Sequence, residues 1–207
     1  MCGRFTVAYS ADEITQYLQD AFAIDGLELP DIPRFNVAPS MDVVAVLYDG
    51  THFRGGPIKW GFTFNKGGKT IQAFNTRIES IQSKPFFNQL YRTQRLALLS
   101  TGYFEWDTHT KHPYWIHYED QSPMFLGGIW RKDATFESSI ITLEAPDDLA
   151  KIHPRVPFSM PLSRVKTWLS EPTQTAAALY QKPSQITPIT SAVNRPENND
   201  ASILKSL

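Results

Sequence analysis

Apolar and polar positions alternate, or apolar residues run together, through most of the middle of the chain, as is typical of half-buried and fully buried β-strands. We predict strands over residues 42–48, 57–62, 71–75, 96–100, 102–106, 113–118, 124–130 and 136–143. The polar residues 107–112, which lie between two of these stretches, predict a hairpin turn.

Helical spacing is confined to short stretches. Ser10-Ala-Asp-Glu13 is a capping-box pattern, and apolar residues follow it at intervals of three and four, which predicts a helix over about 11–23. Shorter helices are predicted at 78–82, 86–91, 147–151, 163–170 and 174–181. From Pro183 onward prolines alternate with polar residues, so we predict an irregular surface tail there.

Many strands with scattered helices, without a regular alternation of the two, predict an α+β fold around a mixed or antiparallel sheet. No linker rich in Gly, Pro or Ser interrupts residues 1–207. We therefore predict a single domain.

Composition narrows the class of protein. Hydrophobic residues make up 42% and charged residues 20% of the 207, which suits a packed core and not a disordered chain. Apolar runs such as 43–48 are too short to span a membrane, which takes about 18 residues or more, and the first residues lack the apolar region of a secretory signal. The single cysteine, Cys2, cannot form an internal disulfide, so we expect a reducing, cytoplasmic compartment.

Although the net charge is only −1, acidic and basic residues are unevenly distributed along the chain. Residues 1–53 carry two basic against eight acidic residues, whereas residues 54–104 carry eight basic residues against Glu79 alone. Such a basic block is a candidate phosphate-binding surface. The alternative is a solvated face that the acidic first third balances in three dimensions.

Cys2 carries the most specific chemistry. A small second residue permits removal of Met1, which would leave a cysteine with a free α-amine. An α-amine has a pKa of about 7.7–8.0 against about 10.4 for lysine, so far more of it is neutral at pH 7.4. Amine and thiol together form a 1,2-aminothiol, which condenses with an aldehyde and closes to a thiazolidine. The same group suits acyl transfer in N-terminal-nucleophile hydrolases.

The motifs around Cys2 occur in a specific order. They are Met1-Cys2-Gly-Arg4-Phe, Asn36-Val-Ala-Pro, Trp60-Gly-Phe, Asn75-Thr-Arg77-Ile-Glu, Gly-Tyr-Phe-Glu105-Trp106 and His153-Pro-Arg155-Val-Pro. From residue 2 to about 160 this series resembles the SOS-response-associated peptidase (SRAP) family, whose members protect abasic sites in single-stranded DNA by covalent attachment through the N-terminal cysteine. The resemblance implies a barrel-like β core with short peripheral helices, and a DNA-damage response enzyme that forms a thiazolidine crosslink.

The resemblance implies four catalytic residues. Cys2 is the nucleophile, Asn75 positions it, Glu105 is the acid–base carboxylate and His153 assists at the deoxyribose. Opening the sugar and forming an imine need proton transfers, which a carboxyl and an imidazole suit. Taken singly, Glu105 could be a salt-bridged or buried strand residue, His153 a helix-end residue and Asn75 a turn residue.

The resemblance also implies DNA contacts. Arg4, Arg77 and Arg155 match positions that contact phosphates, and Trp60 and Trp106 match aromatic positions that can stack on a base. Core packing is an equal alternative for both tryptophans.

The chain also departs from the family pattern. After Trp60-Gly, the family usually has L-I-P, whereas this chain has Phe62-Thr-Phe64. The run that ends at Ser100 is usually R-C-L-I-P in the family. Two further positions differ, since Pro146 replaces an asparagine and Val156 replaces a methionine. The four catalytic positions are unaffected, so the departures bear on the DNA groove.

Other classes of site find less support. His109, His112 and His117 lack the cysteine or carboxylate pattern of a zinc site, and no P-loop or dinucleotide motif is present, so we expect neither metal nor cofactor. We expect a monomer that acts on single-stranded DNA containing abasic sites, without a membrane partner and with replication-fork partners left open. Two alternative functions remain: an N-terminal-nucleophile hydrolase or self-processing peptidase that removes Met1, and a non-covalent reader of modified DNA.

Overall fold

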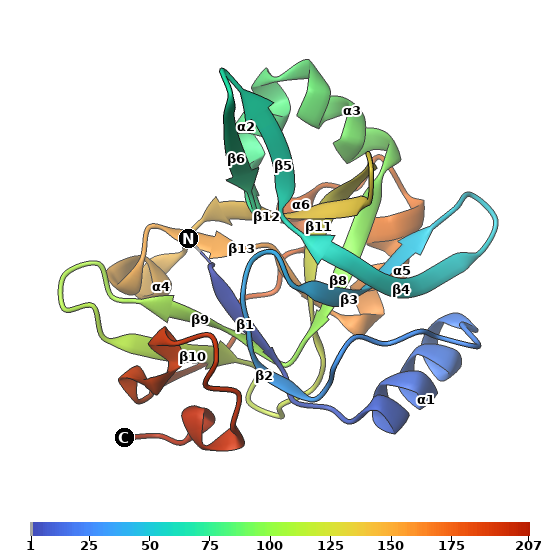
Figure 1. Cartoon of the computed structure of the whole chain (residues 1–207). Helices are drawn as coiled ribbons and strands as arrows, with labels where there is room; N and C mark the ends of the chain where they lie inside the picture. The colour runs from blue at the N-terminus through green and yellow to red at the C-terminus, as the bar shows by residue number, and fades with distance from the viewer. Residues whose placement is uncertain (1) are drawn as a thin grey trace.

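The computed structural model describes residues 2–207, so the predicted removal of Met1 concerns a residue outside the described chain. Strands dominate the fold (Figure 1). They are β1 (Arg4–Val7), β2 (Arg34–Val37), β3 (Asp42–Tyr48), β4 (Phe53–Trp60), β5 (Phe62–Lys66), β6 (Lys69–Ala73), β7 (Asn75–Arg77), β8 (Arg95–Ser100), β9 (Gly102–Trp106), β10 (Pro113–His117), β11 (Met124–Lys132), β12 (Phe136–Glu144), β13 (Arg155–Pro157), β14 (Ser159–Pro161) and β15 (Gln185–Pro188).

Helices are short and lie on the outside of the sheets (Figure 1). They are α1 (Ala11–Phe22), α2 (Ile78–Ser83), α3 (Pro85–Thr93), α4 (Asp147–Ile152), α5 (Leu162–Ser170) and α6 (Ala176–Leu179), with 3₁₀ turns η1 (Ser191–Asn194) and η2 (Ala201–Leu204). The α+β prediction is confirmed. The helix predicted over 11–23 is confirmed as α1, where the Ser10 hydroxyl accepts from the Glu13 N–H and the Glu13 carboxylate accepts from the Ser10 N–H.

Within residues 2–207, the larger sheet contains a closed ring of five strands. Going round the ring, β12 pairs with β4, β4 with β3, β3 with β8, β8 with β11, and β11 again with β12. The β4–β12 pairing is parallel and the other four are antiparallel. Every residue of β8, from Arg95 to Ser100, is buried because this strand has a neighbour on both sides and packing on both faces. The barrel-like core is thus confirmed.

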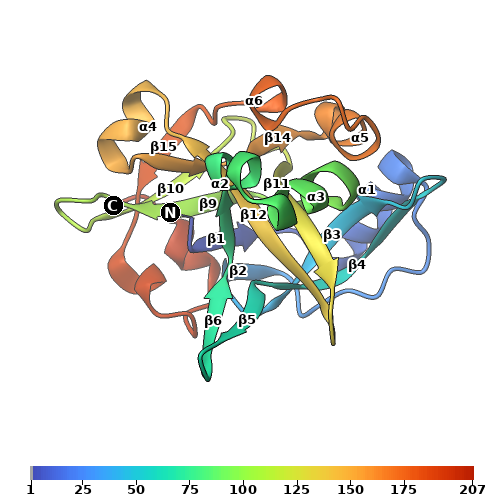
Figure 2. The ribbon, with the colours of Figure 1, turned by 90° about the horizontal axis from the view of Figure 1, so that it is seen from above.

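A second sheet, in the order β15-β10-β9-β1-β2, holds the segments that carry Cys2 and Glu105. Strand β1 pairs antiparallel with β9, with Arg4 opposite Phe104 and Thr6 opposite Gly102. The start of β1 therefore runs beside the end of β9. Seen from above, the β5–β6 hairpin projects from the body of the molecule, on the side away from α4, α5 and α6 (Figure 2).

Gly102 allows the chain to pass from β8 into β9. Its φ is +151°, and a Cβ atom there would lie 2.4 Å from the Trp115 indole nitrogen and 2.8 Å from the Ile116 carbonyl oxygen. No side chain fits so close to these atoms, so glycine is required where β9 begins. The position of Glu105, three residues further along, depends on this close packing.

The prediction of an irregular tail from residue 183 is wrong for much of that segment. Strand β15 pairs with β10, and Ile189, Val193 and Ile203 are buried against Phe104 and Trp115. Asn36 anchors this segment, because its side-chain amide donates to the carbonyls of Val193, Arg195 and Asn198 at 2.9–3.2 Å. The proline-rich composition of this segment gave no indication that it forms a small second core.

We expect Asn36→Ala to destabilise the protein by about 3 kcal/mol, because it removes several buried hydrogen bonds and leaves carbonyl oxygens unsatisfied. Urea denaturation measures this loss. Asn65→Ala, at an exposed asparagine of the β5–β6 hairpin, is the matched control and should change stability little. A similar loss in both variants would show that Asn36 does not anchor the tail.

Candidate active site

Cys2 lies two residues before β1 and is fully buried. Its backbone carbonyl accepts a 2.7 Å hydrogen bond from Asn75 Nδ2, and its thiol donates to the Arg4 carbonyl at 3.6 Å. Burial, together with the nearby Glu105 carboxyl, raises the pKa of the Cys2 thiol well above its usual range. The thiol is therefore protonated at neutral pH, and a base must accept its proton before it can act as a nucleophile.

Glu105, near the end of β9, is 4% exposed. Burial raises the pKa of its carboxyl from 4.5 to about 7. A group with this pKa gives up and takes back a proton with nearly equal ease at physiological pH. The structure thus brings a buried carboxyl with a near-neutral pKa within electrostatic reach of Cys2.

Asn75 is brought to Cys2 by the pairing of β7 with β12, in which it lies opposite Ile140. The preceding residue is also held in place, since the Phe74 carbonyl accepts from the Trp60 indole at 2.8 Å. Among the described residues, the buried Oδ1 of Asn75 has no hydrogen-bond partner. Asn75 therefore offers an unused acceptor next to the Cys2 backbone.

His153 ends α4, as the helix-end alternative predicted, and its N–H donates to the Leu149 carbonyl. Its Nδ1 lies 3.0 Å from the Arg155 backbone nitrogen and 3.1 Å from the Arg155 carbonyl oxygen, so either tautomer of the ring has a hydrogen-bond partner there. Partial burial lowers the pKa of the imidazole, so it is neutral at pH 7 and able to accept or relay a proton.

The two tryptophans have different environments in the structure. Trp60 is fully buried and packs against Phe5 at 5.0 Å between ring centres. Its ring is not exposed, which favours the core-packing alternative for Trp60 over a base-stacking role. Trp106 is partly exposed, and its indole N–H donates to Asn194 Oδ1 at 2.7 Å.

The three arginines differ as well. Arg77 is exposed at the end of β7. Arg4 donates to Asn36 Oδ1 at 3.0 Å and to the Val193 carbonyl at 2.8 Å, so it ties β1 to the C-terminal segment. Arg155 forms a two-bond ion pair with Glu79 at 2.9 and 3.0 Å. Among the described residues, Arg77 is thus the one of the three without a hydrogen bond or ion pair to another residue, although its charge helps to lower the pKa of the nearby Glu79 carboxyl.

Sequence reasoning left Tyr103 without a role. This residue is fully buried on β9, and burial together with the neighbouring Tyr180 and Cys2 raises the pKa of its hydroxyl. Its hydroxyl is buried without a hydrogen-bond partner among the described residues. The sequence feature that could have pointed to Tyr103 is its place in the Gly-Tyr-Phe-Glu-Trp motif, two residues before Glu105.

The hairpin histidines do not gather into a metal site. Within residues 2–207, no three His, Cys, Asp or Glu side chains lie close enough to hold a metal ion. His117 instead stacks on Trp115 with ring centres 3.8 Å apart and hydrogen bonds to the Tyr118 carbonyl. Across the same described residues, no helix combines the length and the apolar composition that crossing a bilayer requires.

Curated proteins with similar sequences share one description. The chain is 32% identical to the abasic site processing protein YoaM of Bacillus subtilis over 228 residues, which cover 99% of this chain and 97% of that protein. It is 26% identical to the abasic site processing protein YedK of Escherichia coli, with 99% of each chain covered.

Solved structures show the same fold. A protein from Bacteroides thetaiotaomicron superposes with a TM-score of 0.77 at 18% identity over 100% of both chains. A phage-related protein from Bordetella bronchiseptica does so with a TM-score of 0.63 at 21% identity, covering 86% of this chain and 85% of that one. The family described as SOS response associated peptidase (SRAP) matches residues 1–196. With nearly the whole length matched, the chain belongs to the SRAP family, in agreement with the resemblance of its motifs.

Proposed function

We propose that this protein recognises abasic sites in single-stranded DNA and attaches to them covalently through Cys2 once Met1 has been removed. The observation that carries the proposal is the pairing of a fixed N-terminal cysteine with a buried acid. Asn75 holds the Cys2 backbone at 2.7 Å, and Glu105, with a pKa of about 7, interacts with the same residue. The names of the curated relatives, abasic site processing proteins, support the choice of substrate.

The reaction has two bond-forming steps. The Cys2 amine attacks the aldehyde carbon of the ring-opened deoxyribose, and loss of water gives an imine. The Cys2 sulfur then adds to the imine carbon while a proton moves from sulfur to nitrogen, which closes the thiazolidine. The overall change is one aldehyde and one aminothiol giving one thiazolidine and one water.

Glu105 supplies the protons that these steps need. Its acid form can protonate the departing hydroxyl when the imine forms, and its base form can accept the thiol proton before sulfur attacks. Because the pKa of the thiol is raised by burial, this second role matters most. His153, neutral and at the end of α4, is suited to assist ring opening at the sugar oxygen.

Asn75 orients the nucleophile. Its amide nitrogen binds the Cys2 carbonyl, while its buried Oδ1 is available to accept from the freed α-amine. Holding the amine toward the aldehyde lowers the entropy cost of the first attack.

Intact mass spectrometry of the purified protein tests the proposal. We expect a mass lower by one methionine residue, and a new species after incubation with an abasic oligonucleotide that equals protein plus oligonucleotide less one water. The same oligonucleotide with its aldehyde reduced to an alcohol is the control and should give no adduct. Active protein that retains Met1 in full would refute the mechanism, because an acylated amine cannot form the imine.

Binding to undamaged single-stranded DNA should weaken as salt rises, because contacts to phosphates release counterions. Arg77→Ala should lower affinity for all sequences alike, and should reduce the log–log salt slope by about 0.7 per lost phosphate contact. Fluorescence anisotropy with several oligonucleotides measures both quantities. Lys166→Ala removes an exposed charge on α5, beside Phe22 of α1, and should leave the slope unchanged. A loss confined to one DNA sequence would contradict a phosphate contact at Arg77.

A further inference from the structure

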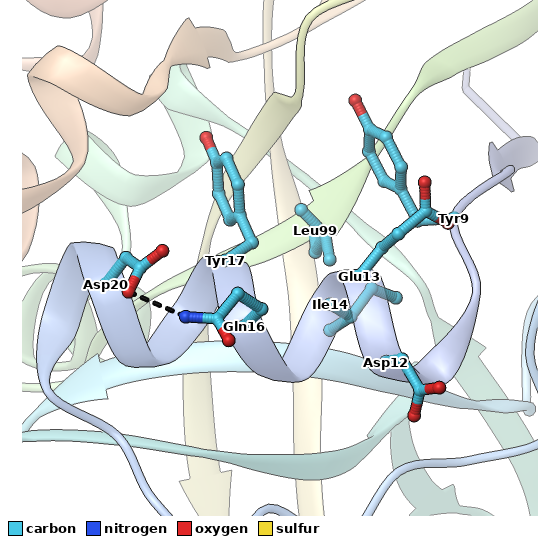
Figure 3. Close-up of a pocket in the computed structure, with 8 residues that line it drawn as sticks. All are labelled: Tyr9, Asp12, Glu13, Ile14, Gln16, Tyr17, Asp20 and Leu99. Atoms are coloured by element: carbon cyan, nitrogen blue, oxygen red, sulfur yellow. Dashed lines mark hydrogen bonds between the residues drawn. The ribbon is translucent and has the colours of Figure 1, made fainter.

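A groove beside α1, at the end of β1 remote from Cys2, has no part in the proposed reaction. Its volume is about 590 Å³. Figure 3 shows the rings of Tyr9 and Tyr17 standing on either side of a slot, with Leu99 between them at its base. The side walls are therefore aromatic rings and the floor is aliphatic.

Both rings are held by the surrounding structure. Tyr17 stacks on Phe125, with ring centres 6.4 Å apart and planes inclined by 24°. The Tyr9 hydroxyl donates to the Gln121 carbonyl at 3.2 Å. The slot is thus formed before any ligand arrives, which reduces the entropy cost of filling it.

The rim of the groove is acidic. Asp12, Glu13 and Asp20 line it, all three are exposed, and none of the described lining residues is basic. Asp120, on the loop beyond β10, adds to this negative field, since it and Glu13 both raise the pKa of the Tyr9 hydroxyl after the larger effect of burial. A polyanion such as DNA is repelled here, whereas a cation with an apolar or planar body is attracted.

We propose that this groove binds a basic segment of a partner protein, with an arginine side chain seated between Tyr9 and Tyr17 and paired with the carboxylates at the rim. A guanidinium is planar and weakly hydrated, so it can stack on an aromatic face while its N–H groups point at carboxylates. A lysine ammonium fits the charge but has no planar group to stack on a ring. The groove is lined by residues of α1, and α1 lies far from the start of β1 in the view of Figure 1, so the partner can stay bound while the protein holds DNA.

The test uses the full-length protein and hexa-arginine amide as probe, with hexa-lysine and hexa-citrulline amides for comparison. Amide NMR shifts locate the binding site and isothermal titration gives the affinity. Tyr17→Leu removes one wall, and Asp12→Asn with Asp20→Asn removes two rim charges. Asp25→Asn with Glu28→Gln is the matched control, because these exposed acids follow α1 but do not line the groove.

We expect shifts at residues 9–20, and an affinity about tenfold lower in Tyr17→Leu and in the rim variant, from losing the cation–π contact or the two charges. Tyr17→Phe should bind like the parent, which separates loss of the aromatic face from misfolding. Abasic-DNA crosslinking should be unchanged in every variant, so the groove and the proposed function are tested separately. Equal weakening by the control pair, equal affinity for the lysine peptide, or shifts away from α1 would each overturn the proposal.

Discussion

Cys2→Ala should abolish the stable DNA–protein adduct outright, the largest effect we expect from any single substitution. The alanine variant still has an α-amine once Met1 is removed, so it can form an imine with the aldehyde. Without sulfur the imine cannot close, and it hydrolyses. A denaturing gel should therefore show no covalent band for this variant, even after long incubation.

Adding borohydride to the same reaction makes the test sharper. Reduction traps the imine, so the Cys2→Ala band should appear with the reductant and be absent without it. Cys2→Ser should behave in the same way, because a hydroxyl is a much poorer nucleophile toward the imine than a thiol. A stable band from Cys2→Ala without reductant would place the nucleophile elsewhere. If the wild-type protein forms no adduct and Cys2→Ser binds abasic DNA as tightly as the wild type, the protein is a non-covalent reader.

Glu105→Gln should slow crosslink formation by about 10²–10⁴-fold, the usual contribution of a positioned acid or base. The product should still accumulate at long times, because Cys2 makes both bonds. For the wild type the rate should change slope near pH 7, where the Glu105 carboxyl titrates. The glutamine variant should lose this inflection, and a quenched time course across pH measures it. Glu144→Gln, at an exposed carboxylate that ends β12, is the matched control.

The same substitution should alter stability in a direction that the pKa dictates. Because burial raises the pKa of Glu105 to about 7, the folded protein retains a proton between pH 4.5 and 7 that the unfolded chain releases. Stability therefore falls as pH rises through this window, by about 3 kcal/mol at most. Glu105→Gln removes this loss, so the variant should unfold at higher urea concentration than the wild type at pH 8, with little difference at pH 4. A wild type whose stability rises across the window would contradict the raised pKa.

The four residues predicted to be catalytic illustrate how far sequence reasoning reached. The family resemblance predicted Cys2, Asn75, Glu105 and His153 as a set, and the structure brings Asn75 to the Cys2 backbone and Glu105 within electrostatic reach of its thiol. The pKa of Glu105 could not be predicted from its neighbours in sequence. It depends on how completely β1 and the surrounding core exclude water from one carboxyl.

The contacts of the predicted DNA-binding residues were decided by pairings distant in sequence. Arg155 meets Glu79 across 76 residues, and Arg4 meets Val193 across 189. Trp60 ends a strand of the closed ring, and that ring buries its indole. A tryptophan or arginine has the same local pattern whether it faces solvent or another strand, so these outcomes lay beyond sequence reasoning.

The sequence by itself determined the features that depend on residues close together in the chain. The capping box at Ser10 specified α1, apolar alternation specified the long strands, and the second position of Cys2 is the basis of the chemistry that we propose for it. Strands of three or four residues, such as β1 and β13, are too short to show a period and were missed. Tertiary structure alone decided the closure of the ring, the docking of the C-terminal segment through Asn36 and the near-neutral pKa of Glu105. The physical reason is that hydrogen bonding between distant strands and exclusion of water are properties of the assembled core, whereas periodicity records only which side of each segment is buried.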